Sequence, residues 1–539
     1  MDGQRTLIVG GTVFTADEAQ PFAEAVVIAG SRLAYVGSTA KAVALAGPGA
    51  KRIDADGGLV LPGFVDGHVH VAMTGANLRK AQLRDAVDLD DICHRIARWA
   101  DANPTAPRVL GTSWLGTAIP GGVPTKEMLD AVIPDRPVYL EANDLHSSWV
   151  NSAALAELGI DRDTPDPIGG RIVRDVNGDA TGHLLENANI ELVWQLLADV
   201  PDSEIEDQVL AALDAYRAAG ITSAVEMAVG ARELAAMARL EATGRLTTRI
   251  VAHVIVHRSS SSEAELAQVE AAVALRDRYR SDRLRVAGIK LITDGTIDAC
   301  TAAMIDPYTN GTNDEPIWPL ESLQPVVTAA DAAGLQVAIH AIGDQAVRNA
   351  LDALELAAAT NGTSGRRHRI EHLESAQTED IARLGPLGVT ASMQPVHLDP
   401  AILPIWIQML GVERAENGFA WPGYLDGGAT LVFGTDTPTA PLEPLPNMYL
   451  ASTRRSPGDP SLAPLRPEWA LPLANALIHA TRESAWAAHL DHLTGVLREG
   501  LAADLVVLDR DPLAEGPASL LETSIVITIV DGAIVHAAG

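Results

Sequence analysis

The chain is poor in cysteine, in cationic residues and in long apolar runs. Its only two cysteines among 539 residues, Cys93 and Cys300, exclude a disulfide framework and a cysteine-rich zinc site. Forty Lys and Arg stand against 70 Asp and Glu, which gives a formal net charge of −30 at pH 7. A field of this sign repels phosphate backbones and anionic headgroups, so nucleic acid and membrane surfaces are not expected as partners.

No apolar run reaches the roughly 18 residues that a membrane span requires. The first residues, MDGQRTLIVGGTVFTADE, lack the cationic stretch followed by an apolar core that marks a secretory signal. They already have the composition of a strand. The scarcity of cysteine fits a reducing compartment, and we therefore expect a cytoplasmic location.

The composition and the length predict a folded chain of more than one domain. Hydrophobic residues make up 47% and charged residues 20%, which is close to the globular average and far from that of disordered chains. A chain of 539 residues exceeds what one hydrophobic core usually organises. We expect one large domain, a barrel of about 250 residues or more, together with a smaller one.

Both ends of the chain are rich in short strand-like runs. In residues 1–60 these runs are separated by Gly-Gly, Asp-Gly and Gly-Ser turn signals. Residues 496–539 also contain short strand-like runs, with an Asp-Gly hairpin signal in the last of them. This arrangement predicts a small β-sandwich domain built from both termini. Residues 61–495 then form the main domain as a central insertion.

The middle of the chain alternates apolar strands with amphipathic helices. The strand candidates are residues 64–70, 221–227, 249–256, 284–293, 336–342, 369–374, 389–394 and 429–436. This eightfold alternation predicts an α/β fold, a (β/α)₈ TIM barrel. The segment between the first and second of these strands, roughly residues 75–200, is too long for a barrel loop and contains the strand-like runs RVLGTSW and RPVYLEAND. We therefore expect an inserted lid or substrate subdomain there.

Polar side chains occupy the ends of five of these strands. His68 and His70 lie two residues apart at the end of the first strand, so the period-two geometry puts both imidazoles on the inward face. Later strands contribute four more residues, namely Lys290, His340, His372 and Asp436. All six are expected at the C-terminal mouth of the barrel, where barrel enzymes carry their sites.

Taken alone, a His-X-His pair or a buried histidine is more often structural than a ligand. Six such residues without partners would each cost roughly 2 kcal/mol or more on burial. A divalent ion removes these costs together, because imidazole and carboxylate groups suit zinc or a similar metal. The set therefore predicts a metal site.

Seven segments carry a resemblance that covers essentially the whole chain. They are GFVDGHVH (63–70), NDLHSSWVNSAAL (143–155), TGHLLENA (181–188), IKLITDGTIDACTAA (289–303), IHAIGD (339–344), RIEHLE (369–374) and FGTDTP (433–438). These segments resemble the metal-dependent amidohydrolase superfamily, the relatives of urease and dihydroorotase. Within it they resemble the branch of YtcJ-like proteins and N-substituted formamide deformylases (amidohydrolase family 3).

The resemblance implies two divalent ions per chain, expected to be Zn²⁺. His68, His70 and Asp436 would hold the first ion, His340 and His372 the second, and a carboxylated Lys290 would bridge them. A bare ammonium cannot ligate a cation, whereas a carbamate is an anionic donor that spans ions roughly 3.5 to 4 Å apart. The alternative for Lys290 is a plain salt bridge.

The resemblance also implies a reaction. Two ions that share a water lower its pKa and produce hydroxide, and Asp436 takes the proton and passes it to the leaving nitrogen. The expected activity is hydrolysis of an amide-type, non-peptide C–N bond in a small molecule, an N-substituted formamide or another N-acyl amine. A carbamate, a cyclic amide or an ester are alternative substrates. A non-catalytic scaffold is a further alternative, but the presence of all six candidate metal-site residues argues against it.

A homodimer is the expected assembly.

Several other residues are candidates for substrate contact. His146 and Trp149 belong to the run HSSWV of the insertion, where a packed lid interior is the alternative. The other candidates, Glu226, Asp294 and Trp318, follow or end barrel strands and are also compatible with supporting positions.

Three more residues near the expected mouth have open roles. Asp66 either orients the His-X-His segment or shapes its turn, and His397 is expected behind the ligands or on the surface. Cys300 stands where the family more often has Arg, which weakens any inference of a bound anionic substrate group.

Overall fold

The structure is a computed structural model that describes residues 5–143, 147–167, 170–186, 188–198, 200–259, 261–363 and 365–538. It consists of two compact units. The first joins Met1–Val71 to Leu213–Gly539, and the second is Ala72–Ala212. Within the described residues, no helix combines the length and the apolar character needed to cross a membrane.

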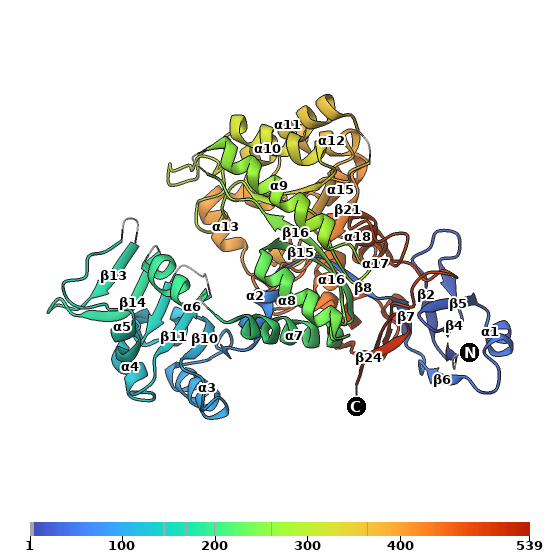
Figure 1. Ribbon diagram of the computed structural model, residues 1–539, viewed down its shortest axis with the longest axis horizontal. Helices are drawn as coiled ribbons and strands as arrows, with labels where there is room; N and C mark the ends of the chain where they lie inside the picture. Colours follow the sequence, from blue (N-terminus) through green and yellow to red (C-terminus); the bar gives the residue numbers. More distant parts are fainter. Residues whose placement is uncertain are drawn as a thin grey trace. The chain divides into compact units, whose positions relative to one another are not determined.

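A parallel sheet of eight strands forms the centre of the first unit (Figure 1). In chain order, which is also the order of pairing, its strands are β8 (Phe64–Val69), β15 (Ile221–Val229), β16 (Arg249–Ile255), β17 (Leu284–Ile292), β18 (Gln336–Ala341), β19 (Arg369–His372), β20 (Thr390–Met393) and β21 (Leu431–Phe433). A bridge between Val69 and Thr437 joins the first strand to the segment after the last. The predicted (β/α)₈ barrel is confirmed, and every barrel strand overlaps its expected range.

Helices lie between these strands along the chain and after the last of them. They are α7 (Asp202–Ala218), α8 (Ala231–Ala242), α9 (Ser262–Arg278), α10 (Leu320–Ala332), α11 (Asp344–Asn361), α12 (Thr378–Leu387), α13 (Leu403–Leu410), α14 (Val412–Glu416), α15 (Trp421–Asp426), α16 (Pro444–Thr453), α17 (Leu473–His479) and α18 (Arg482–Ala487). Strands β8 and β19 are buried along their whole length, which explains their near-continuous apolar character. The charged and imidazole side chains inside them are therefore exceptions that need partners.

The two termini share a small β domain. One sheet has the order β5-β4-β1-β6 and the other the order β24-β23-β22-β7-β2-β3. Their strands are β1 (Thr6–Val9), β2 (Thr12–Phe14), β3 (Phe22–Ala23), β4 (Ala25–Ala29), β5 (Arg32–Gly37), β6 (Lys51–Asp54), β7 (Leu59–Pro62), β22 (Leu505–Leu508), β23 (Ile525–Val530) and β24 (Ala533–Ala537), with helices α1 (Thr39–Ala46) and α19 (Pro512–Glu515). Antiparallel pairing of β7 with β22 places the blue and red ends of the chain side by side in Figure 1.

The second unit contains a six-stranded sheet of its own, with the order β13-β14-β12-β11-β10-β9. Its strands are β9 (Ala81–Gln82), β10 (Val109–Trp114), β11 (Val138–Ala142), β12 (Ser147–Val150), β13 (Gly170–Arg174) and β14 (Ala180–Glu186), and its helices are α2 (Val71–Leu78), α3 (Leu89–Ala102), α4 (Lys126–Asp130), α5 (Ser152–Glu157) and α6 (Gln195–Ala198). Helix α3 begins at an Asp88 cap and buries Ile92 and Ile96 against this sheet. The runs RVLGTSW and RPVYLEAND form β10 and β11.

A buried ion pair joins the barrel to the β domain. Arg249, the first residue of β16, donates from Nε to Asp504 Oδ2 at 2.7 Å and from Nη2 to Asp504 Oδ1 at 3.2 Å. Both side chains are at most 1% exposed. Asp531, which is partly exposed, also contacts the guanidinium.

We predict that Asp504→Ala lowers the free energy of unfolding by about 3 kcal/mol, because it leaves the buried Arg249 without its main partner. Urea unfolding followed by circular dichroism measures the loss. Glu499→Ala, which removes an exposed carboxylate nearby in the sequence, is the control and should stay within about 0.5 kcal/mol of the parent. Equal stability of the two variants would contradict a role for this pair.

Candidate metal centre

Two glycines allow the first and last barrel strands to approach each other at the mouth. Asp436 N donates to His68 O at 2.7 Å, and His70 N donates to Thr437 O at 3.0 Å. A Cβ on Gly434 would lie 2.4 Å from His68 N, and one on Gly67 would lie 2.7 Å from the Phe433 oxygen. Only glycine fits at these positions, which explains the sequences DGHVH and FGTD.

Asp66 holds the same two segments together. Its Oδ1 accepts from His68 N at 3.2 Å and from Thr435 N at 2.9 Å, while its Oδ2 accepts from the Thr435 hydroxyl at 2.7 Å. Burial raises the pKa of Asp66 to about 7, although these hydrogen bonds oppose the shift. Of its two possible roles, the contacts therefore favour orientation of the His-X-His segment.

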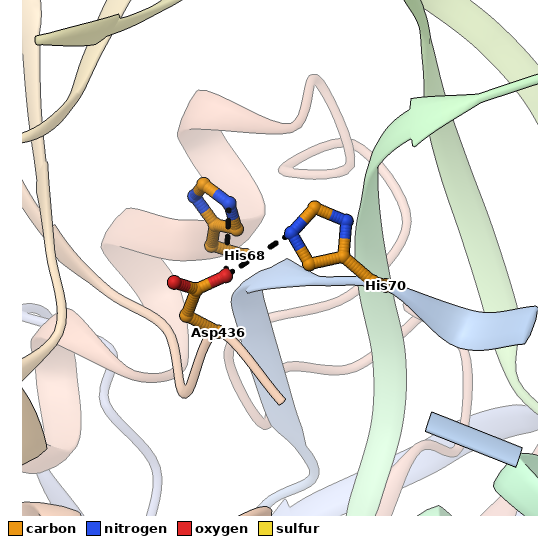
Figure 2. A group of neighbouring side chains, drawn as sticks. All are labelled: His68, His70 and Asp436. Carbon is orange, nitrogen blue, oxygen red and sulfur yellow. Dashed lines mark ion pairs between the residues drawn. The ribbon is translucent and has the colours of Figure 1, made fainter. Parts of the chain in front are cut away.

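His68, His70 and Asp436 converge on one point (Figure 2). The Nε2 atoms of the two rings lie 3.3 and 3.1 Å from Asp436 Oδ1. The Nδ1 atoms are occupied, because His68 contacts Glu371 Oε2 at 2.8 Å and His70 donates to the Met227 carbonyl at 2.5 Å. Among the described residues, the buried Asp436 Oδ1 has no hydrogen-bond partner.

The electrostatics of this group call for a cation. Burial and the charge of Lys290 lower the pKa of His68 to about 4, so its Nε2 carries a lone pair toward the carboxylate. Burial raises the pKa of Asp436, but the neighbouring imidazoles of His68 and His70 outweigh it and hold the pKa well below its ordinary value. For His70 the carboxylate outweighs burial and raises the pKa. Two imidazole nitrogens and one carboxylate oxygen within reach of one another are a donor set that fits a divalent metal ion.

His340 and His372 form a second group beside the first. Their ring centroids lie 4.4 Å apart, and that of His372 is 5.0 Å from that of His68. His372 Nδ1 contacts Gln394 Oε1 at 2.9 Å, and His340 Nε2 donates to the Gly295 carbonyl at 3.2 Å. These bonds leave His372 Nε2 and His340 Nδ1 as acceptors. Burial lowers the pKa of both rings, that of His340 to about 3.

The backbone is held in an uncommon conformation at two of these residues. His372 has φ of 75° and Asp436 has φ of 58°, both in the left-handed region that residues other than glycine rarely adopt. Such conformations concentrate at functional sites, because the surrounding structure has to hold them. Here they turn the last residue of β19 and the segment after β21 toward the mouth.

Lys290 lies on β17 and is only 2% exposed. Its charge lowers the pKa of His68, His340 and His372, so its amine lies near both groups. Burial lowers the pKa of Lys290 to about 8, while Glu371 and Asp436 oppose this shift. The structure therefore brings all six predicted residues together at one mouth.

Comparisons with known proteins identify the family of the chain. Residues 51–536 match the model of a family described as Amidohydrolase family. The chain belongs to the amidohydrolase family. It is 30% identical to the protein LONG AFTER FAR-RED 3 of Arabidopsis thaliana over 98% of this chain and 90% of that protein. It is also 30% identical to the putative amidohydrolase YtcJ of Bacillus subtilis, with 98% of each chain covered.

Two further relatives bear on the activity of this amidohydrolase. The N-substituted formamide deformylase of Arthrobacter pascens is 28% identical over 98% of this chain and 97% of its own. A solved structure of an uncharacterized metal-dependent hydrolase from Pyrococcus furiosus superposes with a TM-score of 0.76 at 27% identity. It covers 94% of this chain and 100% of its own. The predicted family and fold class are confirmed.

Sequence reasoning missed a pair of charged residues in this amidohydrolase. Glu371 on β19 is fully buried, accepts from Arg369 Nη2 at 3.0 Å, and orients His68 through its Nδ1. Burial raises the pKa of Glu371, but Arg369 and His68 outweigh it and hold the pKa well below its ordinary value. The available signal was the alternation of two charged residues in the buried strand RIEH, since both face the barrel interior.

We predict that Glu371→Gln weakens metal binding by about 10- to 100-fold, because the carboxylate that orients a histidine ligand is lost. Equilibrium dialysis against Zn²⁺ measures this affinity. Glu379→Gln, an exposed substitution of the same kind on α12, should bind as the parent does. Unchanged zinc affinity in Glu371→Gln would show that the contact with His68 does not support a ligand.

His397 lies closer to the centre than expected. Its Nδ1 is 3.1 Å from Glu374 Oε1, and its Nε2 is 3.6 Å from Asp436 Oδ2. Its ring stacks on that of His372 with centroids 5.9 Å apart. His372, Glu374 and His397 therefore form a second set of possible ligands, whose nearest donor atoms lie within 4.8 Å of one another.

The remaining substrate candidates of this amidohydrolase have other contacts. Glu226 accepts from Val71 N, directly after the His-X-His segment. Asp294 accepts from Ala303 N, Ile342 N and Gly343 N at 2.8 to 3.1 Å. Burial raises the pKa of both Glu226 and Asp294 to about 7. Through these contacts, Glu226 and Asp294 hold backbone segments in place around the mouth.

The two candidate tryptophans are buried. Trp318 is 1% exposed and lies beneath the Arg258 guanidinium, 5.7 Å from the ring centroid. Trp149 is fully buried in the core of the second unit and donates from Nε1 to the Thr125 carbonyl at 2.9 Å. Its placement favours the packed interior over substrate contact. His146 lies outside the described residues.

Proposed function

We propose that this protein is a metal-dependent hydrolase that cleaves the amide-type C–N bond of an N-substituted formamide or another N-acyl amine. The observation that carries the proposal is the convergence of two imidazole nitrogens on the buried Asp436 Oδ1. The 28% identity to the N-substituted formamide deformylase of Arthrobacter pascens, over nearly the full length of both chains, supports the substrate class. A cytoplasmic location and a homodimer stay predictions.

His68, His70 and Asp436 would hold one ion, and His340 and His372 a second. We propose zinc, because imidazole and carboxylate ligands in a buried site suit it. When bound, divalent ions of this kind polarise a carbonyl and lower the pKa of a coordinated water. The low pKa values of His68, His340 and His372 keep these ligands neutral, which is the protonation state that binding requires.

Lys290 would act as the bridge after carboxylation. Its neutral amine adds to CO₂, forms a carbamate and releases one proton. The lowered pKa of Lys290, about 8, gives the neutral amine a larger population at neutral pH than an ordinary lysine has. Carboxylation would thus convert an ammonium group, which repels cations, into an anionic donor.

Asp436 would carry the proton. Its carboxylate is anionic and lies within the ligand group, where it can accept a proton from the attacking water. The water oxygen joins the carbonyl carbon, the C–N bond breaks, and the same proton passes to the leaving nitrogen. The products of a formamide are formate and an amine. His397, beside Asp436 Oδ2, lies where it can orient this oxygen.

We predict that Asp436→Asn lowers kcat by at least about 10²-fold, the usual contribution of a general acid and base, while the fold is kept. The assay follows formate and amine release from a series of N-alkylformamides, with N-acetylamines, carbamates and esters in parallel. Asp426→Asn, an exposed substitution at the end of α15, is the control. A rate within a few-fold of the parent would remove the proposed role. Preference for an ester or carbamate would redirect the substrate class.

A further inference from the structure

A cavity of about 280 Å³ lies within the first unit, at the ends of the barrel strands opposite to the candidate metal centre. Residues at the beginning of β17 and β18, the end of α9, and the segments before β19 and after α18 line it. Its lining includes the guanidinium groups of Arg276, Arg285 and Arg366, together with the ring of His489. No carboxylate is among the described residues that line it.

This concentration of cations is unusual in a chain with a net charge of −30. Arg285 is the least compensated of the three arginines. Its Nη2 donates to the carbonyls of Ala488 and His489 at 2.5 Å each, and its buried Nε has no hydrogen-bond partner among the described residues. Burial lowers the pKa of Arg285, against the distant charges of Asp282 and Asp491.

Two of the arginines that line the cavity are paired with carboxylates that do not line it. Arg276 contacts Asp277 at 3.1 Å, and Arg366 contacts Asp331 at 3.0 Å. Asp331 is shared with His368, and Asp491 pairs with Arg367. Burial and the charge of Arg367 lower the pKa of His489, whose Nε2 donates to the Arg366 carbonyl at 3.2 Å. The described lining of the cavity thus contains three guanidinium groups and no carboxylate.

We propose that this cavity binds a small oxyanion, inorganic phosphate or a carboxylate of similar size, and that the anion stabilises this end of the barrel. Guanidinium groups form charge-assisted, often paired hydrogen bonds with such oxygens. Since a water occupies about 30 Å³, the volume holds a small anion with a few waters. The location agrees with a stabilising role, because the N-terminal face of a TIM barrel carries residues for stability rather than catalysis.

Titration calorimetry of the full-length protein with inorganic phosphate tests the proposal. We expect one site per chain, and thermal unfolding at a higher temperature in phosphate than in chloride of equal ionic strength. Arg276→Gln should weaken binding by about tenfold or more, because it removes a charged donor. Arg278→Gln, two residues away in the last turn of α9, is the matched control, since Arg278 is exposed and does not line the cavity.

Three results would overturn the proposal. One is the absence of saturable binding up to about 10 mM phosphate. Another is equal weakening in Arg276→Gln and Arg278→Gln, which would indicate a general charge effect. The third is loss of binding in Asp436→Asn with retention in Arg276→Gln, which would place phosphate at the candidate metal centre. If Arg276→Gln does not fold, Arg366→Gln replaces it with the same expectation. A titration with acetate distinguishes a carboxylate from a phosphate site.

Discussion

Replacement of both His68 and His70 by Ala is expected to empty the first metal site and to lower kcat/KM for amide hydrolysis by at least about 10³-fold. The proposed first site consists of the two Nε2 atoms and the Asp436 carboxylate beside them. The double variant would keep only the carboxylate of this set. A loss of 10³-fold corresponds to about 4 kcal/mol of transition-state stabilisation, which is a reasonable contribution for a metal ion.

The measurement combines elemental analysis for metal per chain with formate release from an N-alkylformamide. His94→Ala with His492→Ala is the matched control, because it removes two exposed imidazoles elsewhere. It should keep the parental metal content and rate. If the His68 and His70 double variant kept its metal and stayed within tenfold of the parental rate, the donor set would be misassigned.

The second large effect is expected for Lys290→Ala, which should lose the second metal and at least about 10³-fold of the activity. The Lys290 side chain is only 2% exposed. In such a poorly screened site, a cationic amine would repel two divalent ions held by the neighbouring residues. Conversion to a carbamate removes this repulsion and supplies the bridging donor. Bicarbonate present during metal loading should therefore raise the active fraction of the parent protein.

Chemical rescue separates a bridging role from a structural one. Acetate or propionate supplies the missing carboxylate, and should partly restore both metal content and rate in Lys290→Ala. The same acids should not restore the His68 and His70 double variant, because the lost groups are imidazoles. A full metal complement and a parental rate in Lys290→Ala would show that no bridging lysine operates in this protein.

The sequence predicted the barrel and its six polar residues because their signals are local. Strands buried on both faces read as apolar runs, and His68 and His70 share a face through the two-residue period of a strand. The two separate β-rich ends of the chain led to the prediction of a shared terminal domain. Its pairing of β7 with β22 joins residues more than 400 positions apart, which the composition suggested without fixing the register.

The supporting contacts could not be predicted, since they depend on long-range pairing. Glu371 orients His68 across 303 positions, and the Met227 carbonyl orients His70 across 157. No local pattern records such a partner. A carboxylate at a strand end can contact a ligand or accept from the following turn, and the sequence does not distinguish these cases. Asp294 accepts three backbone N–H groups, so its role became visible only in the structure.

The most direct test of the central claim is an anomalous scattering measurement on crystals of the zinc-loaded protein. The account predicts a zinc peak bonded to His68, His70 and Asp436, a second bonded to His340 and His372, and density for a carbamate on Lys290 between them. It would be contradicted by the absence of zinc at His68, His70 and Asp436 in fully active protein. A single ion bound only by His372, Glu374 and His397 would contradict it equally.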